Sequence, residues 1–537
     1  MNDMPAAESS HPVEERKSDQ GLARPGDAQA TSASEPSFIP LLFWLVLLAL
    51  ISLVVLQGTW NTVIDVDTWW HLRVGQWVND HHSWMTTDPF SRYGTESGKP
   101  WYAYSWLYEW TLYKLYELLN LRGVIIFRML FVLTLVWGWM VFLQRRGMPY
   151  TWMTALWVSS FLVIGSSLMV ERPWLLTIGF SLWTMDIILQ ARAGYWTNAY
   201  WLLPLGYVLW ANVHIQFIYG LALLGLAVVA PVLDQWLKLP AAKATAQSFR
   251  SDVWWKLVCL SVICFLATLV NPYHYHLYEV VLDYASQAGA FQYVSELRAP
   301  GFRNVTDWLA MMLLAGSLFA LGRCWPVSTF AILLVVGTAF AGLRAVRDLW
   351  YLALGAISVL SFYVPKSLQK HSQIRMTRNM HIGWLVLAWG LALGLPWLLK
   401  PVEFANQENK QYPALAVQHV RGKQYPGPLF NHFDWGGYLI WRLPEYPVAM
   451  DGRTNLHGDR RIADSLNTWT CVTPLPEAEG KPSTRLNWDQ NPDFRSANLI
   501  IAQIDMPLTN LLRLHPAFVK VYEDQRAVVF IRRGQQP

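Results

Sequence analysis

The feature that most constrains the fold is a series of apolar runs, each about long enough to cross a bilayer. A run of about 20 apolar residues suits one crossing of the hydrocarbon core. Only 15% of the 537 residues are charged, whereas about a quarter are charged in a typical soluble chain. The sequence therefore predicts a polytopic α-helical membrane protein with about 11 transmembrane helices. The expected spans are 38–57, 123–143, 149–169, 173–190, 198–213, 216–237, 254–270, 305–321, 326–342, 349–364 and 382–399.

Basic residues in alternate loops predict the orientation of these spans. Cytoplasmic loops carry an excess of Lys and Arg. With a cytoplasmic N-terminus, every basic loop falls inside and residues 400–537 fall outside. The basic residues concerned are Arg145, Arg146, Arg192, Lys238, Lys243, Arg250, Arg323, Lys366, Lys370, Arg375 and Arg378.

Three regions follow from these patterns. Residues 1–37 are polar and lack apolar periodicity, which predicts a disordered cytoplasmic tail. Residues 38–399 form the transmembrane domain, whose outer loop 58–122 holds two amphipathic stretches, Asp67–Val78 and Tyr104–Leu119. We expect both stretches to be interfacial helices lying on the membrane.

Residues 400–537 have shorter apolar runs and more turn residues, which indicates a small extracytoplasmic α/β domain. The predicted helices are 413–421, 459–469 and one near 507–514. The predicted strands are 427–433, 447–451 and 497–503, with a hairpin at 519–532.

A charged cluster lies directly after the first apolar run. Asp65, Asp67, His71 and Arg73 flank the pair Trp69-Trp70. Charges beside lipid are costly, so such a cluster is a functional hypothesis. The two acids could hold a divalent cation, Mg²⁺ or Mn²⁺, beside a phosphate-bearing ligand, or act as a general base. Both tryptophans are expected to be interfacial anchors that hold the acids at headgroup level. The alternative is that the segment is only an aromatic belt with a few solvated charges. Glu109 is expected on a solvated helix face.

Further polar residues interrupt or flank the later spans, all on the outer side of the predicted topology. Arginine suits bidentate phosphate recognition, although each could instead snorkel to headgroups. The histidines are candidate contacts to a pyrophosphate or hydroxyl. Because intramembrane polar groups face the protein interior or water, we expect a shared outward-facing cavity. Its candidate substrate-binding residues are His71, Arg73, Arg172, His214, His274, Arg344 and Arg347.

Two segments stand out in the C-terminal domain. They supply Asp434 in FDWGGY, and Asp451 and Arg453 in DGRTN, as further substrate-binding candidates. The alternative for the second segment is a turn with a structural ion pair. Four cysteines are too few for a disulfide framework. The net charge of +5 is small for this length, which argues against nucleic acid as a partner.

The stretch DVDTWWHLRVGQWV, followed by DPFS and GKPWYAYSWLYEW, resembles the first outer loop of GT-C superfamily glycosyltransferases. It is most similar to the bacterial branch of dolichyl-phosphate-mannose–protein mannosyltransferases and aminoarabinose transferases. FDWGGY and DGRTN are faintly similar to segments of oligosaccharyltransferase catalytic subunits.

The resemblance implies an inverting glycosyltransferase in the bacterial inner membrane. Its donor would be a polyprenyl-phosphate-linked sugar, and its acceptor a glycan, lipid or protein on the outer face. Asp65 and Asp67 match the family's catalytic position, and Asp67 is preferred. The rival functions are a transporter or flippase for lipid-linked saccharides, an oligosaccharyltransferase-like enzyme, and a scaffold that keeps the fold without activity.

Overall fold

The computed structural model describes residues 65–534 except 149, 169, 239–250, 288, 290–293, 364–376 and 473–486, together with 46, 47, 49–51, 53 and 54. The predicted tail and most of the first predicted span lie outside the described residues. So do the basic residues Lys243, Arg250, Lys366, Lys370 and Arg375.

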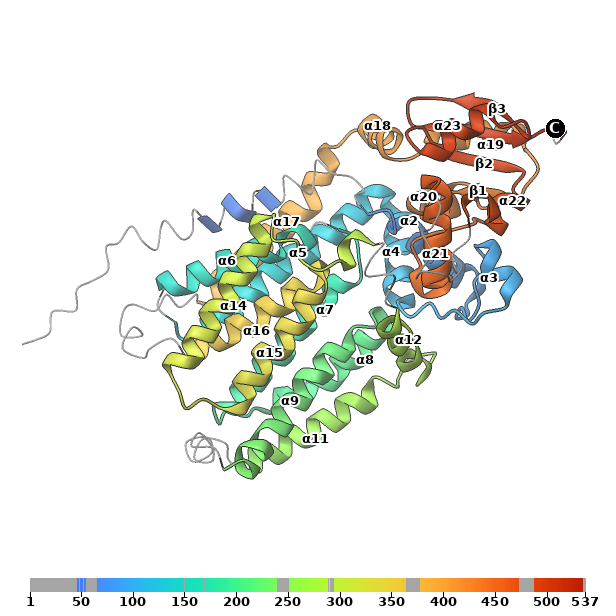
Figure 1. The fold of residues 1–537 in the computed structure, drawn as a ribbon. Helices are drawn as coiled ribbons and strands as arrows, with labels where there is room; N and C mark the ends of the chain where they lie inside the picture. The colour runs from blue at the N-terminus through green and yellow to red at the C-terminus, as the bar shows by residue number, and fades with distance from the viewer. Residues whose placement is uncertain are drawn as a thin grey trace, which may run out of the picture.

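A bundle of apolar helices forms the larger part of the molecule (Figure 1). A helix occupies each of the ten predicted spans from 123 to 399, because long apolar runs satisfy their backbone hydrogen bonds internally. They are α5 (Leu121–Gln144), α6 (Tyr150–Leu168), α7 (Trp174–Arg192), η1 (Asn198–Leu202) with α8 (Leu203–Val213), α9 (Phe217–Trp236), α11 (Ser251–Ala267), α14 (Val305–Arg323), α15 (Thr329–Arg344), α16 (Leu349–Tyr363), and α17 (Arg378–Gly394) with η5 (Leu395–Leu398).

Five helices in the described part of the chain are long and apolar enough to cross a membrane by length and composition. They are α5, α7, α9, α14, and α17 with its extension to Leu398. The predicted total of eleven crossings remains a prediction, because several of the other apolar helices have fewer than 18 residues.

The outer loop folds into three helices beside one end of the bundle (Figure 1). They are α2 (Thr68–His81), α3 (Arg92–Ser97) and α4 (Trp106–Leu119), so both amphipathic stretches are helical as predicted. Short helices α12 (His276–Ser286), η2 (Ser295–Leu297) and η3 (Val346–Asp348) belong to other loops.

The C-terminal domain contains a four-stranded sheet of order β1-β2-β4-β3, with β1 (Leu429–Asn431), β2 (Leu499–Gln503), β3 (Phe518–Glu523) and β4 (Ala527–Arg532). β1 pairs in parallel with β2, and β3 and β4 form the predicted hairpin. The first four residues of β2 are apolar because the sheet buries them. The domain's helices are α18 (Pro401–Gln411), α19 (Ala414–Lys423), α20 (Phe433–Arg442), α21 (Thr454–Thr470), η6 (Trp488–Gln490), α22 (Pro492–Ser496) and α23 (Pro507–Leu514).

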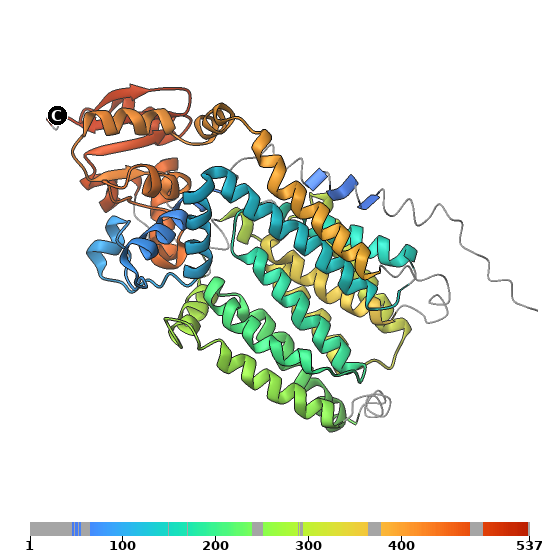
Figure 2. The same cartoon turned by 180° about the vertical axis from the view of Figure 1, so that it is seen from behind.

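The domain prediction was wrong in two places. Residues 447–451 form no strand, although Val448 makes one isolated bridge to Ser91. Residues 433–442 form the unpredicted helix α20, whose glycines allow close approach to neighbouring backbone. A Cβ at Gly437 would lie 2.7 Å from the carbonyl oxygen of Val66. α20 and α21 thus pack beside the outer loop, as the view from behind also shows (Figure 2).

The tryptophans of the charged cluster were also misplaced by the sequence analysis. Trp69 and Trp70 are 1% and 6% exposed, because α2 packs between α4 and α20. Trp69 packs edge-on against Tyr412 and Tyr438. These rings are therefore core residues that join the outer loop to the C-terminal domain, and not membrane anchors.

Candidate active site

A cavity of about 420 Å³ lies where the outer loop, the loops at the ends of the bundle helices and the C-terminal domain meet. It brings together seven of the predicted site residues from segments far apart in the sequence. They are Asp67, His71, Arg172, His214, Arg347, Asp434 and Arg453.

Arg172 is the centre of the charges in this cavity. Its guanidinium contacts both carboxylate oxygens of Asp65, and lies 2.9 Å from Asp67 Oδ2 and 2.6 Å from Glu296 Oε1. Three carboxylates surround the Arg172 guanidinium, which therefore holds these acids in place. A cation with fewer close carboxylates is better suited to the phosphate binding that was predicted for Arg172.

Asp65 and Asp67 differ in how their oxygens are used. Asp65 accepts the backbone N–H of Asp67 at 2.8 Å and is bound by Arg172 through both oxygens. Asp67 uses Oδ2 for Arg172 and lines the cavity, and its side chain is 13% exposed. Asp65 thus orients the start of α2, and Asp67 presents its carboxylate to the cavity.

The environment of Asp67 makes it suited to accept a proton. Burial raises the pKa of Asp67 to about 7; Arg172 opposes this shift and Asp65 adds to it. A carboxyl with a pKa near neutrality is substantially ionised at physiological pH, yet holds a proton well once it has received one.

A second buried pair stands behind the cavity wall. His71 Nδ1 lies 2.9 Å from Glu109 Oε1, and Glu109 is 1% exposed, contrary to the solvated position expected for it. Burial raises the pKa of Glu109 well above its usual value and lowers that of His71, and Arg172 contributes to the latter shift. Both shifts favour the uncharged form of each side chain, and the His71 ring lines the cavity.

The C-terminal domain completes the cavity through Gly452 and Arg453. Arg453 is 2% exposed and bridges Asp88 of the outer loop, at 2.6 Å, and Asp451, at 2.7 Å. Asp451 also accepts from His457 at 3.2 Å. Asp451 is therefore part of a buried ion-pair network, which is the structural alternative considered for this segment.

Gly452 lies directly against the carboxylate of Asp67. A Cβ at this position would lie 2.1 Å from Asp67 Oδ1, so any side chain here must displace the acid. We expect Gly452→Ala to lower turnover by about 100-fold, because a misplacement of about 1 Å in a reacting group has an effect of that size.

The matched control is Gly422→Ala in α19, where a Cβ meets no atom within 4 Å. The initial rate of turnover, measured for both variants at equal concentrations of folded protein, tests this expectation. Equal rates for Gly452→Ala and wild type would contradict a requirement for this contact.

Five predicted residues are not among those that line the cavity, and Asp65, described above, is one of them. Arg73 bonds to Gln76 and lies over the ring of Phe90. His274 is exposed with a positive φ and contacts the Leu269 carbonyl, because it follows the end of α11. Asp451 is enclosed as described above. Arg344 lines an adjoining groove.

The sequence analysis missed several residues of the cavity wall. Glu296 and Tyr284 come from segments with no recognisable motif, whereas Trp101 and Tyr104 lie inside the quoted stretch GKPWYAYSWLYEW. Attention to aromatic residues in that stretch could have found the latter two.

The proposed divalent cation finds no ready position between the two acids. Any ion bridging Asp65 and Asp67 would have to displace the guanidinium of Arg172. Among the residues that the structure describes, no group of three or more His, Cys, Asp or Glu side chains is arranged to hold a metal ion.

Two grooves open from the cavity. The first is apolar, has a volume of about 430 Å³, and shares Tyr104, His214, Tyr284, Leu297 and Arg347 with the cavity. Its other walls come largely from apolar residues of α9, α12 and α15. The second is polar, has a volume of about 270 Å³, and shares Val66 and Asp434 with the cavity. Its further residues are Gln411, Tyr412, Trp435, Gln503, Ile504, Asp505 and Arg526.

Comparison with known proteins finds similarity among solved structures. No family model matches the chain, and no curated protein matches it in sequence. Among solved structures, the chain is similar to the crystal structure of ArnT from Cupriavidus metallidurans bound to undecaprenyl phosphate, at 15% sequence identity and a TM-score of 0.40. The similarity covers 91% of this chain and 97% of that chain.

Proposed function

We propose that the chain is a membrane glycosyltransferase that moves a sugar from a polyprenyl-phosphate donor to an acceptor. The observation that supports this best is the junction of an acid-lined cavity with an apolar groove. A lipid-linked sugar has an apolar tail, an anionic phosphate and a hydroxyl-rich head, in that order. The groove, Arg347 and the cavity present matching surfaces in the same order.

Arg347 is the cation that we assign to the donor phosphate. It lines both the groove and the cavity, and its Nε has no hydrogen-bond partner among the described residues. Its nearest carboxylates, Glu296 and Asp348, lie 3.6 and 3.8 Å away, which leaves the guanidinium available for a phosphate. Arg344 lines the same groove.

The acceptor would approach through the polar groove beside Asp434. Asp67 then removes the proton of the acceptor hydroxyl, and the oxygen attacks the anomeric carbon. The bond from that carbon to the phosphate oxygen breaks, and its electron pair leaves with polyprenyl phosphate. Attack opposite to the leaving group inverts the configuration, and Arg347 stabilises the charge that develops on the phosphate.

The topology that accompanies this proposal follows from the basic loops. The cavity and C-terminal domain would face the outer side of a bacterial inner membrane, with the N-terminus in the cytoplasm. Transfer would therefore use donors that have already reached the outer leaflet.

Release of polyprenyl phosphate from a panel of radiolabelled lipid-linked sugars, with a crude envelope fraction as acceptor, tests the function. We expect release that depends on both donor and acceptor. Movement of intact lipid-linked sugar across proteoliposomes, without release, would favour the transporter and contradict the transferase.

Arg347→Gln tests the assignment of the phosphate site. We expect donor affinity to fall at least tenfold, since a hydrogen bond to a charged group is worth about 1.5–3 kcal/mol. Arg303→Gln is the matched control, because Arg303 is exposed and lines neither the cavity nor the apolar groove. Equilibrium binding of the donor measures both variants, and equal affinity would remove Arg347 from the site.

A further inference from the structure

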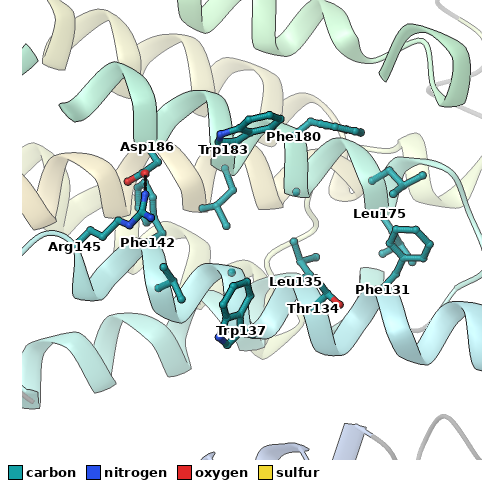
Figure 3. A pocket seen from close by; sticks show the side chains of 15 residues that line it. Phe131, Thr134, Leu135, Trp137, Phe142, Arg145, Leu175, Phe180, Trp183 and Asp186 are labelled. Atoms are coloured by element: carbon teal, nitrogen blue, oxygen red, sulfur yellow. Dashed lines mark hydrogen bonds and ion pairs between the residues drawn. The ribbon is translucent and has the colours of Figure 1, made fainter. Parts of the chain in front are cut away.

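Another cavity, separate from the candidate active site, lies between α5 and α7 (Figure 3). Its volume is about 400 Å³, and its walls are mainly aromatic and aliphatic, including Phe131, Trp137, Phe180 and Trp183. We call it the α5–α7 groove. None of its residues lines the central cavity or either of the grooves that open from it.

Two glycines keep the α5–α7 groove open. Gly138 of α5 and Gly179 of α7 both line it. A Cβ at Gly138 would lie 3.6 Å from Leu182, and one at Gly179 would lie 4.0 Å from Leu135. These are ordinary contact distances, so a methyl group would fit at either position without a clash. The groove's volume of about 400 Å³ and its apolar lining suit part of an apolar chain from outside the protein.

A charged cluster closes one end of the groove. Arg145 and Arg146 both pair with Asp186, and Figure 3 shows Arg145 beside Asp186 at the end opposite to Phe131 and Leu175. The Asp186 and Arg146 side chains are each 9% exposed, whereas Arg145 is 56% exposed. Two cations on one carboxylate leave a net positive charge, and Arg145 presents it outward.

The charged end lies far from the central cavity along the helix axes. Trp174, the first residue of α7, lines the central cavity, and Asp186 is 12 residues further along. Twelve residues of helix span about 18 Å. Arg145 directly follows α5, whose first residue follows the outer loop. The groove's charged end therefore belongs to the opposite leaflet from the proposed site of transfer.

We propose that the α5–α7 groove binds an anionic phospholipid. One acyl chain would lie between the two helices, and the phosphate would contact Arg145. The net positive charge selects an anionic headgroup over a zwitterionic one, because each interfacial Arg attracts an anionic lipid by about 1 kcal/mol. The guanidinium of Arg145 suits a phosphate in geometry as well as in charge.

Native mass spectrometry of the full-length protein in detergent tests the proposal. The probes are phosphatidylglycerol and phosphatidylcholine with identical acyl chains. We expect wild type to retain phosphatidylglycerol more tightly by about fivefold, as expected for one interfacial cation. Arg145→Gln should abolish that preference, and Arg146 would still neutralise Asp186, so the fold should persist.

Two further variants separate charge from shape. Arg323→Gln removes an exposed cation at the end of α14, outside the groove, and should leave the preference intact. Gly179→Leu fills the groove and should weaken retention of both lipids. Equal retention of the two lipids by wild type, or an unchanged preference in Arg145→Gln, would overturn the headgroup site. Unchanged retention in Gly179→Leu would overturn the groove as the place of the acyl chain.

Discussion

Asp67→Asn is expected to lower turnover by about 10³-fold, within the range that a positioned general base contributes. The amide keeps the size of the side chain and can still contact Arg172, but it cannot take the acceptor proton. Because burial raises the pKa of Asp67 to about 7, the wild-type rate should rise with pH through that value as the carboxyl ionises. The measurement is the pH profile of polyprenyl-phosphate release for both proteins.

The same substitution is expected to raise the stability of the fold although it lowers turnover. In the folded protein Asp67 holds its proton up to about pH 7, whereas the carboxyl ordinarily ionises near 3.8. Ionisation of Asp67 therefore destabilises the fold increasingly as pH rises above the ordinary value and up to about 7. We expect Asp67→Asn to melt at a higher temperature than wild type at pH 8. Equal turnover in the two proteins would exclude Asp67 as the base and turn attention to Asp65.

Arg453→Met should destabilise the protein by about 3–5 kcal/mol, since removal of one partner leaves buried carboxylates without compensation. The Arg453 side chain is 1% exposed, and those of Asp88 and Asp451 are fully buried. Burial alone would raise the pKa of Asp451, but Arg453 and His457 lower it well below its usual range. This contribution to stability is complete above the ordinary pKa of the carboxyl and is lost only in strong acid.

Thermal melting of the full-length protein in detergent measures the loss. The control is Arg513→Met, which removes an Arg that pairs with Glu523 while both side chains are about 30% exposed. Such surface pairs contribute about 0–1 kcal/mol. Similar melting temperatures for Arg453→Met and Arg513→Met would show that the network is not a main support of the fold.

The helical bundle could be predicted from sequence because apolar runs of sufficient length have few alternatives to helix. Residues 216–237 illustrate this, since α9 covers Phe217–Trp236. The helix α20 could not be predicted in the same way. Its ten residues include two glycines with a low helix propensity. Gly437 lies against Val66 and Trp70 of the outer loop, and Gly436 lies against Met450 and Asp451.

Part of the candidate site followed from a simple physical rule. Polar residues on one side of the predicted topology were expected to share a cavity, and Asp67, Arg172 and Arg347 do so. Their partners could not be inferred. That Arg172 would be enclosed by Asp65, Asp67 and Glu296 depends on loops separated by more than 100 residues, and no local pattern specifies it.

The contact between Asp67 and Gly452 has a consequence for biosynthesis. The two residues are 385 positions apart, so a ribosome completes nearly the whole chain before the acid meets its neighbour. Domains generally fold as units during synthesis. A nascent chain whose C-terminal domain has not yet folded would have Asp67 and the apolar groove but an incomplete cavity. We therefore expect a chain truncated before Gly452 to lack the activity proposed for this cavity.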